Sequence, residues 1–425
     1  MLVSDSELLT GSVKEKIEEL QEVDILVGIP SYNNSRTIPH VVKAVHAGLA
    51  KYYPNAKCVL VNSDGGSKDG TPDLVSQTDV GNLDMILVDH PVYLISKIVT
   101  PYHGIPGKGS AFRTIFKIAE NLNAKACCVV DSDLRSITPE WIELLLDPIM
   151  DKGFDYVAPL YSRHKFDGTI TNSIVYPMTR AMYGKQIRQP IGGEFGFSGK
   201  LASHYLTKNV WESDVARYGI DIWMTTTAIG DGYKVCQSYL GAKIHDAKDP
   251  GSDLSAMYTQ VVSSLYAYLE SYQHIWKDIT GSEKVPTFGF RFDVGLEPVN
   301  VNIERMIHSY QLGIESLIPF LEKILNDDEL KELKNLAGKD QSTFHLPDEL
   351  WVKIVFRYAI AYHRRIWAVE QLMKSMIPLY MGRTASFVID NFNSSADEVE
   401  KNIESLCLAF EKQKPMLIRD WENHK

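Results

Sequence analysis

The sequence predicts an α/β protein built on a mostly parallel sheet with helices on both faces, followed by a helical C-terminal region. Between residues 24 and 160, short continuously apolar runs alternate with stretches of helical spacing, which is typical of strands that are buried on both faces. Several of these runs end in polar or turn residues, as strands do where an open α/β sheet binds its ligands. Beyond residue 300, only helical spacing remains.

Each predicted element follows from the spacing of its apolar residues. Apolar runs predict strands over 24–30, 57–62, 85–88, 126–131 and 156–159. Helical spacing predicts helices over 37–53, 108–121, 139–150 and 253–275, and a helix start at 69–75. Further helices are predicted over 303–325, with a kink at Pro319, and over 350–373 and 398–410. We therefore expect an N-terminal helix (1–22), a main domain (23–290) and a helical C-terminal region (291–425).

The composition limits the partners and the location of the protein. A net charge of −10 argues against duplex nucleic acid as a partner, and a diphosphate substrate would need a metal or local positive charge. No apolar run approaches the roughly 20 residues of a membrane span, and the N-terminus lacks the apolar core of a signal peptide. The five cysteines show no CxxC spacing, so we expect buried, reduced thiols in a cytoplasmic protein.

The most informative motif is Asp131-Ser132-Asp133, which follows the apolar run 126–130. If the strand continues through the motif, Asp131 and Asp133 share a face, because side chains alternate along a strand. Two hard oxygen ligands there would suit Mg²⁺ or Mn²⁺ carrying a substrate diphosphate. The alternative is that these carboxylates only cap the next helix.

Two other strand ends carry polar residues. Asp64, after Ser63, would accept hydrogen bonds from a base or ribose, and the alternative is an ordinary Asx turn. Pro30, Tyr32 and Asn33 would lie beside a nucleotide base, or would simply form a strand-to-helix loop.

Further candidates carry charge. Lys108, between two glycines at a helix start, would attract an anion, although the segment is not a P-loop. His245 would supply a third metal ligand, or would be a structural histidine, and Lys243 on the same strand would face an anion. Asp221 would either cap a helix or orient an acceptor hydroxyl.

The segment around Asp167-Gly168 combines cations with hydroxyls and an amide, a set that would suit a small anionic acceptor. These residues are Arg163, His164, Lys165, Thr169, Thr171 and Asn172. The alternative is an exposed basic turn.

In chain order, the motifs resemble the retaining glucosyl-3-phosphoglycerate synthase family, whose close relatives make the mannosyl compound or glucosylglycerate. The motifs that carry this likeness are Ile29-Pro30, Asn62-Ser63-Asp64, Gly107-Lys108-Gly109, Asp131-Ser132-Asp133, Asp167-Gly168, Pro190-Ile191-Gly192-Gly193-Glu194, Tyr218-Gly219-Ile220-Asp221 and His245. The likeness spans residues 23–275, and its specificity lies in the combined order of the motifs.

The resemblance implies the GT-A fold, Mg²⁺ or Mn²⁺, a UDP-glucose, GDP-glucose or GDP-mannose donor, and 3-phosphoglycerate or glycerate as acceptor. Together with the strand-end residues, it puts the donor at Pro30, Tyr32, Asn33, Ser63, Asp64, Lys108, Asp131, Ser132 and Asp133. It puts the metal at Asp131, Asp133 and His245, and the acceptor at Arg163, Gly168, Thr169, Thr171, Asn172 and Lys243. Lys108 and Asp221 take catalytic roles, and a homodimer is the expected assembly.

Members of that family retain the anomeric configuration, and the favoured route has the leaving diphosphate help to deprotonate the acceptor. The metal and Lys108 would stabilise charge on the leaving group, and no covalent nucleophile is evident in the sequence. The product would be a compatible solute or a polysaccharide precursor. One departure is Thr169, where phosphoglycerate-using members tend to carry arginine. Either Arg163 or Arg188 substitutes for it, or the acceptor is unphosphorylated glycerate.

Three alternatives stay open. An inverting transferase acting on a polysaccharide or lipid would want a catalytic base such as Asp221 and usually a membrane association. A nucleotidyltransferase would usually open with a Gly-rich, arginine-containing loop after the first strand, which residues 30–34 lack. A non-catalytic sugar-nucleotide-binding protein would use the helical region for interactions, and Asp133→Ala distinguishes it from an enzyme by the loss of turnover.

Overall fold

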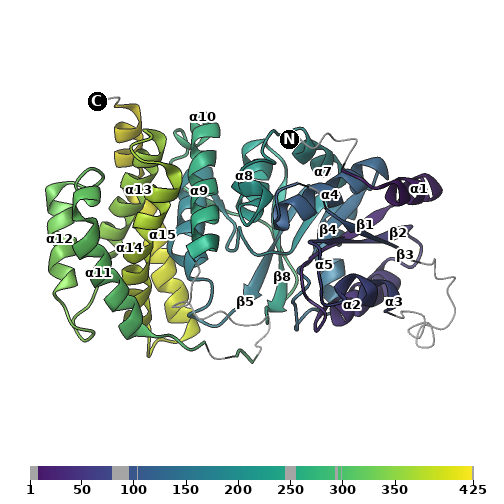
Figure 1. Ribbon diagram of the computed structural model, residues 1–425, viewed down its shortest axis with the longest axis horizontal. Helices are drawn as coiled ribbons and strands as arrows, with labels where there is room; N and C mark the ends of the chain where they lie inside the picture. The colour runs from purple at the N-terminus through teal and green to yellow at the C-terminus, as the bar shows by residue number, and fades with distance from the viewer. Residues whose placement is uncertain are drawn as a thin grey trace. The chain divides into compact units, whose positions relative to one another are not determined.

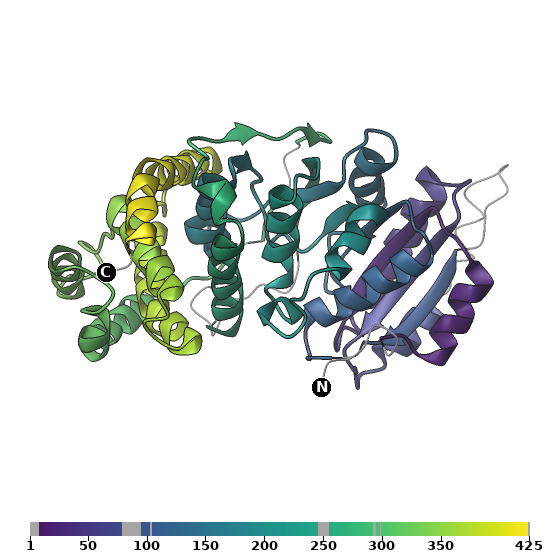
Figure 2. The same cartoon turned by 90° about the horizontal axis from the view of Figure 1, so that it is seen from above.

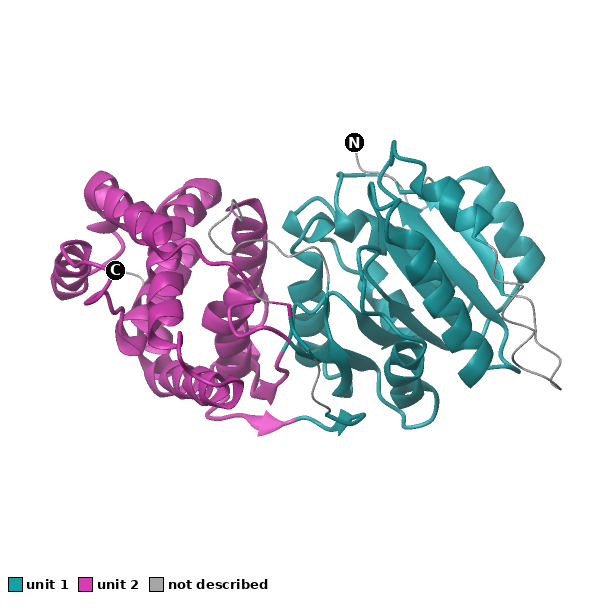
Figure 3. Cartoon of the chain, turned by 90° about the horizontal axis from the view of Figure 1, so that it is seen from below, with its two compact units in different colours: residues 1–162, 189–246, 285–296 teal, residues 163–188, 247–284, 297–425 magenta. Residues whose placement is uncertain are grey.

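The computed structural model describes residues 8–78, 95–102, 104–244, 255–291, 295–297 and 299–423. The chain forms two compact units, which are coloured separately in Figure 3. The first unit contains residues 1–162, 189–246 and 285–296, and the second contains 163–188, 247–284 and 297–425. Each unit is described by itself below.

The first unit contains the predicted, mostly parallel sheet. Its strand order is β10-β8-β5-β7-β4-β1-β2-β3, and only β7 runs antiparallel to its neighbours. The strands are β1 (Ile25–Ser31), β2 (Cys58–Asp64), β3 (Ser96–Pro101), β4 (Ala126–Val129), β5 (Tyr156–Ser162), β7 (Phe195–Ser198), β8 (Val235–Ala242) and β10 (Thr287–Phe288). Figure 2 shows the N-terminal strands, purple to blue, side by side. The α/β fold class with a mostly parallel sheet is therefore confirmed.

Helices cover both faces of this sheet, as its apolar strands require. They are α1 (Gly11–Leu20), α2 (Ile38–Tyr52), α3 (Thr71–Gln77), α4 (Lys108–Asn121), α5 (Glu140–Met150), α7 (Gly199–Leu206), the short η3 (Asp214–Ala216) and α8 (Ile220–Gly230). In Figure 1, α2 and α5 lie on one side of the strands, and α4 and α7 lie on the other. Val27 and Ile29 of β1 accordingly pack in one buried cluster with α2 and α5. A Cβ on Gly28 would instead lie 2.7 Å from Ile115 of α4.

The predicted element boundaries differ from the structure at specific places. The predicted helix 108–121 matches α4 at both ends, whereas the predicted strand 85–88 lies outside the described residues. The strand predicted over 126–131 is shorter in the structure, where β4 ends at Val129. Ser132 and Asp133 lie in the turn that follows. The antiparallel β7 was not predicted at all. Its few residues pair with two strands that are distant in sequence, so the local pattern gives little indication of it.

The second unit is helical. Its elements are η2 (Thr171–Val175), α6 (Tyr176–Tyr183), α9 (Ser255–Ser271), α10 (Gln273–Trp276), α11 (Ile303–Leu321), α12 (Asp327–Ala337), α13 (Asp348–His363), α14 (Val369–Asp390) and α15 (Ala396–Glu422), with a short parallel strand pair, β6 (Lys185–Gln186) and β9 (Glu283–Lys284). The predicted helix 350–373 was wrong as one element. The chain breaks between α13 and α14, where Arg365 has a positive φ of 54°.

The units divide the chain differently from the predicted ranges, because residues 163–188 and 247–284 group with the C-terminal helices. A buried cation explains part of this grouping. Arg180 on α6 is 2% exposed and pairs with Glu404 at 2.5 Å and with Glu411 at 2.7 Å, both on α15. A buried guanidinium needs such partners, so it holds α6 against α15.

Two further expectations concern the whole chain. All five cysteines are buried free thiols, as predicted. Among the described residues, the structure has no helix with both the length and the apolar character needed to cross a membrane.

Candidate functional site

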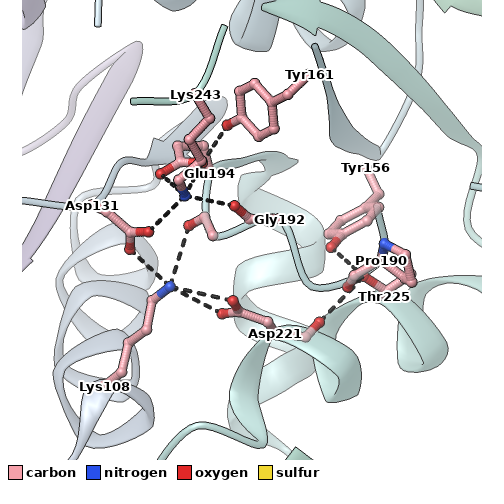
Figure 4. Close-up of polar contacts among 11 residues, drawn as sticks. Lys108, Asp131, Tyr156, Tyr161, Pro190, Gly192, Glu194, Asp221, Thr225 and Lys243 are labelled. Atoms are coloured by element: carbon pink, nitrogen blue, oxygen red, sulfur yellow. Dashed lines mark hydrogen bonds and ion pairs between the residues drawn. The ribbon is translucent and has the colours of Figure 1, made fainter. Parts of the chain in front are cut away.

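A chain of alternating charges lies at the carboxyl edge of the sheet in the first unit (Figure 4). Its members come from distant parts of the sequence that the parallel topology brings to one edge. Lys108 begins α4, Asp131 follows β4, Glu194 precedes β7, Asp221 lies in the first turn of α8 and Lys243 follows β8. We call these five residues the charged network.

Lys108 connects two of the carboxylates. Its Nζ lies 2.8 Å from Oδ1 of Asp131 and 3.2 and 3.3 Å from the two carboxylate oxygens of Asp221. Burial opposes the charged form of Lys108, but the adjacent Asp131 and Asp221 outweigh it and raise the pKa of the ammonium above its ordinary value. The Lys108 side chain is still 16% exposed, so this fixed positive charge is accessible at the sheet edge.

Lys243 connects Asp131 to Glu194. Its Nζ lies 3.0 Å from Oδ2 of Asp131 and 2.8 Å from both carboxylate oxygens of Glu194, and it donates to the carbonyl of Gly192 at 2.8 Å. Glu194 is fully buried and also accepts a hydrogen bond from the Tyr161 hydroxyl. Burial raises the pKa of Glu194 to about 7, and the neighbouring Lys243 lowers it only in part.

Asp131 has both carboxylate oxygens paired, one with Lys108 and the other with Lys243. Burial alone would raise the pKa of Asp131, but the two ammonium groups lower it well below its usual range. In this geometry Asp131 therefore holds the two lysines, which is a different task from the metal ligation that the sequence suggested.

The prediction that placed Asp131 and Asp133 on one face of a strand, as metal ligands, is wrong. β4 ends before Asp131, so the alternation of a strand does not place Asp131 and Asp133 on a common face. The third predicted ligand, His245, lies outside the described residues. Within the part of the chain that the structure describes, no three His, Cys, Asp or Glu side chains gather as a metal site. Asp133 is partly exposed and forms no ion pair with another described residue, so its carboxylate is available to a divalent cation.

The loop before β7 fits closely around the charged network. Gly193 has a φ of +98°, and a Cβ at this position would lie 2.3 Å from Oδ2 of Asp131 and 2.8 Å from Nζ of Lys243. Thr225 of α8 donates to the carbonyl of Pro190 at 2.7 Å and lies 2.8 Å from the Tyr156 hydroxyl, which joins this loop to the helix that carries Asp221 (Figure 4). Sequence reasoning assigned no role to Tyr161, Gly193 or Glu194. The only available signal was the Gly192-Gly193-Glu194 motif.

Asp64 forms the Asx-turn arrangement that was its alternative interpretation. Its carboxylate accepts hydrogen bonds from the Ser31 hydroxyl at 2.7 Å, from the backbone N–H groups of Gly66 and Ser67 at 2.9 and 2.7 Å, and from the Ser67 hydroxyl at 2.7 Å. At 4% exposure, Asp64 thus shapes the loop after β2.

The remaining donor candidates lie on the neighbouring loops. The Asn33 side chain accepts from the Lys68 N–H at 3.0 Å, and the Ser132 hydroxyl donates to Asn34 at 2.8 Å. Pro30 is buried near the end of β1, whereas Tyr32 is 62% exposed. Among these residues, Tyr32 is the large side chain still available to a ligand.

Most of the predicted acceptor residues belong to the second unit. They are Arg163, Gly168, Thr169, Thr171 and Asn172. Gly168 has a φ of +66°, Arg163 lies 3.6 Å from Asp167, and the buried Thr169 hydroxyl lies 2.6 Å from the Tyr380 hydroxyl. Lys243 belongs to the first unit, so the predicted acceptor site draws on both units and stays a prediction.

Comparisons with known proteins agree with the resemblance in the motifs. Residues 26–200 match glycosyl transferase family 2. The glucosyl-3-phosphoglycerate synthase of Petrotoga mobilis is 25% identical over 198 residues, which cover 43% of this chain and 57% of that protein. The match thus spans less than two thirds of the relative's length.

Two solved structures of glucosyl-3-phosphoglycerate synthase from Mycobacterium tuberculosis are also similar. One contains Mn²⁺, UDP and glucosyl-3-phosphoglycerate, with a TM-score of 0.44, 21% identity, and coverage of 60% of this chain and 84% of that chain. The other contains Mn²⁺, UDP-glucose and phosphoglyceric acid, with a TM-score of 0.43, 20% identity, and coverage of 59% and 83%.

Proposed function

We propose, from the premise that residues 26–200 form a glycosyl transferase family 2 region, that the protein is a metal-dependent hexosyltransferase. It transfers glucose or mannose from a nucleotide-diphosphate sugar to 3-phosphoglycerate or glycerate, with retention of the anomeric configuration. The observation that carries the proposal is the charged network, because it holds a lysine with a raised pKa at the sheet edge where α/β folds bind their ligands.

Lys108 is suited to stabilise a leaving diphosphate. Its charge is held in place by Asp131 and Asp221, so little reorganisation is needed as negative charge develops on the leaving group. Asp131 and Glu194 are paired with the lysines, which leaves them poorly placed to attack a sugar carbon. This supports the front-face route, in which the leaving diphosphate helps to deprotonate the acceptor.

The chemistry of Asp133 fits a divalent metal. A partly exposed carboxylate is a preferred ligand of Mg²⁺ and Mn²⁺, which keep several positions for waters and substrate phosphate oxygens. When bound, such an ion would act as a Lewis acid on the diphosphate. We assign Asp133 to the ion, with His245 as the proposed second ligand, and we assign Asp131 to the lysines.

The relatives support the proposed substrates. The name of the Petrotoga mobilis protein supports glucose as the sugar and 3-phosphoglycerate as the acceptor. Thr169, in place of the expected arginine, supports unphosphorylated glycerate. UDP and GDP sugars both remain candidates for the donor. A cytoplasmic location and a homodimer are part of the same proposal.

The decisive experiment is a transfer assay with purified protein. Mg²⁺ or Mn²⁺ is combined with UDP-glucose, GDP-glucose or GDP-mannose, and each donor is offered 3-phosphoglycerate or glycerate. Mass spectrometry of the glycoside identifies the product. We expect transfer from one donor, and its loss after chelation of the metal and in Asp133→Ala. The absence of transfer with every pair, in folded protein, would refute the proposal and favour a non-catalytic sugar-nucleotide-binding protein.

A further inference from the structure

A cavity of about 410 Å³ lies wholly within the second unit and contains none of the five residues of the charged network. Its walls come from the start of η2, the chain just before and at the start of α13, and the helices α14 and α15. The volume is within the range of sites for small molecules. Two predicted acceptor residues, Thr169 and Asn172, are among those that line it.

A buried arginine lines the cavity, and one of its three nitrogen atoms has no hydrogen-bond partner among the described residues. Arg383 is 5% exposed, its Nη2 lies 2.6 Å from Asp348, and its Nη1 donates to the carbonyl of Leu346 at 3.0 Å. Its Nε–H has no hydrogen-bond partner among the described residues. A buried donor without a partner is unfavourable, and a ligand oxygen would satisfy it.

Amide side chains add acceptors to this donor. The Asn402 side-chain N–H donates to the Asn391 amide oxygen at 2.7 Å, and that of Asn172 donates to the carbonyl of Asp167 at 3.2 Å. The amide oxygens of Asn402 and Asn172 can then accept hydrogen bonds from a ligand. Phe387, Ile403 and Leu406 supply apolar wall between these groups.

The charge of the lining argues against an anionic ligand. Arg383 is neutralised by Asp348, and Asp390 and Glu349 are two further carboxylates of the lining, so the lining carries a surplus of negative charge. A phosphate or carboxylate would be repelled by this surplus of negative charge. Hydroxyl groups carry no charge and both donate and accept hydrogen bonds. Thr169 and Asn172 therefore line a cavity that disfavours anions, whereas the acceptor that the sequence suggested, phosphoglycerate, is an anion.

We propose that this cavity binds an uncharged polyhydroxyl compound, such as a free hexose or a neutral glycoside. The hydroxyls pair with the guanidinium of Arg383 and the two amide oxygens, and the carbon face of the ring packs on Phe387. The proposal does not depend on the charged network, which contributes no residue to the cavity, but it replaces the acceptor role predicted for Thr169 and Asn172.

The test is a titration of the full chain with D-glucose, D-mannose and sucrose, followed by calorimetry and saturation-transfer NMR. Ser405→Trp, which places a large side chain at a lining position of α15, is expected to weaken binding by at least about tenfold, equivalent to 1.4 kcal/mol. Leu408→Trp is the matched control, because it adds the same side chain to the same helix at a 50% exposed position outside the lining. Asn402→Ala should weaken binding without filling the cavity.

Several results would overturn the inference. The first is the absence of saturable binding by all three sugars. The second is equal binding in Ser405→Trp and Leu408→Trp when circular dichroism shows both folded. The third is binding of a charged compound at this cavity in place of the sugars, tested with the anion 3-phosphoglycerate and the cation choline. Lys108→Met separates the two proposals, because it should leave sugar binding unchanged even where transfer is lost. Failure of the transfer assay alone therefore refutes the proposed function and leaves the cavity proposal standing.

Discussion

Each unit of the protein buries cationic side chains among carboxylates, and the two arrangements differ in how exposed those carboxylates are. In the first unit, Lys108 and Lys243 are shared by three carboxylates that sit at the sheet edge with little exposure. In the second unit, Arg180 faces Glu404 and Glu411, and the Glu404 side chain is 50% exposed. Water therefore reaches Glu404 in the second case, whereas Glu194 in the first case is fully buried.

This difference in exposure indicates that the charged network of the first unit is reactive and that the Arg180 cluster of the second unit is structural. Burial without full compensation raises the pKa of Glu194 to about 7 and also raises that of Asp221. The carboxyl partner of Arg180 behaves in the opposite way, because the arginine lowers the pKa of Glu404. We therefore expect changes in the first network to alter activity, and changes in the second to alter stability alone. The predictions below test that contrast, in order of decreasing effect.

Lys108→Met should reduce turnover by about 10²–10³-fold, because it removes the charge that faces the leaving group. Steady-state kinetics with the productive substrate pair measures the effect. Lys117→Met is the control, since Lys117 lies on the same helix but pairs with Glu120 outside the network. If Lys108→Met stays folded and keeps the turnover of the control, the first network is structural and the contrast fails.

Arg180→Met should lower the free energy of unfolding by about 3 kcal/mol, because Glu411 would lose its buried cation and α6 its contact with α15. Urea unfolding monitored by circular dichroism checks this. Arg419→Met, at a 65% exposed arginine of α15, should change stability far less. Protein that remains folded should keep its turnover, and a specific loss of turnover would show that the second unit contributes to the chemistry.

Gly193→Ala should cost about 1–3 kcal/mol of stability and also reduce turnover, because its Cβ would displace Asp131 and Lys243. Gly232→Ala provides the comparison. Gly232 also has a positive φ, of +78°, but a Cβ there meets nothing within 4 Å. The difference between the two variants isolates the clash, and equal effects would show that only backbone strain is involved.

The smallest expected effect is a dependence of stability on pH. Glu194 titrates near 4.5 when unfolded and near 7 when folded, so the folded state binds the extra proton between these values. Its contribution to stability is therefore complete below about pH 4.5 and is lost as the pH rises through about 7. Unfolding free energies measured across this window should fall less steeply in Glu194→Gln. An identical slope in both proteins would contradict a raised pKa.

Much of the fold follows from local patterns. The helical spacing of Ile115 and its neighbours gave both ends of α4, and therefore the position of Lys108 at a helix start. The continuous apolar run of β1 required cover on both faces, which α2, α4 and α5 provide. Such elements are predictable because their signal lies within a few residues of one another.

The partners of the charged network are not predictable in this way. Lys108 and Asp221 are separated by 113 positions, and Glu194 and Lys243 by 49. Glu194 also depends on β7, an antiparallel strand inserted between β4 and β5. A glutamate beside two glycines in the sequence carries no sign that it will be buried.

The sequence by itself determined the alternation of strands and helices, and with it the edge at which the polar strand ends gather. Only the tertiary structure decided that Asp131 binds two lysines, that Asp64 closes its own turn and that Arg180 joins residues 163–188 to the C-terminal helices. The physical reason is that periodicity records which face of an element is buried. The energy of a charge depends instead on which distant groups share its low-dielectric surroundings.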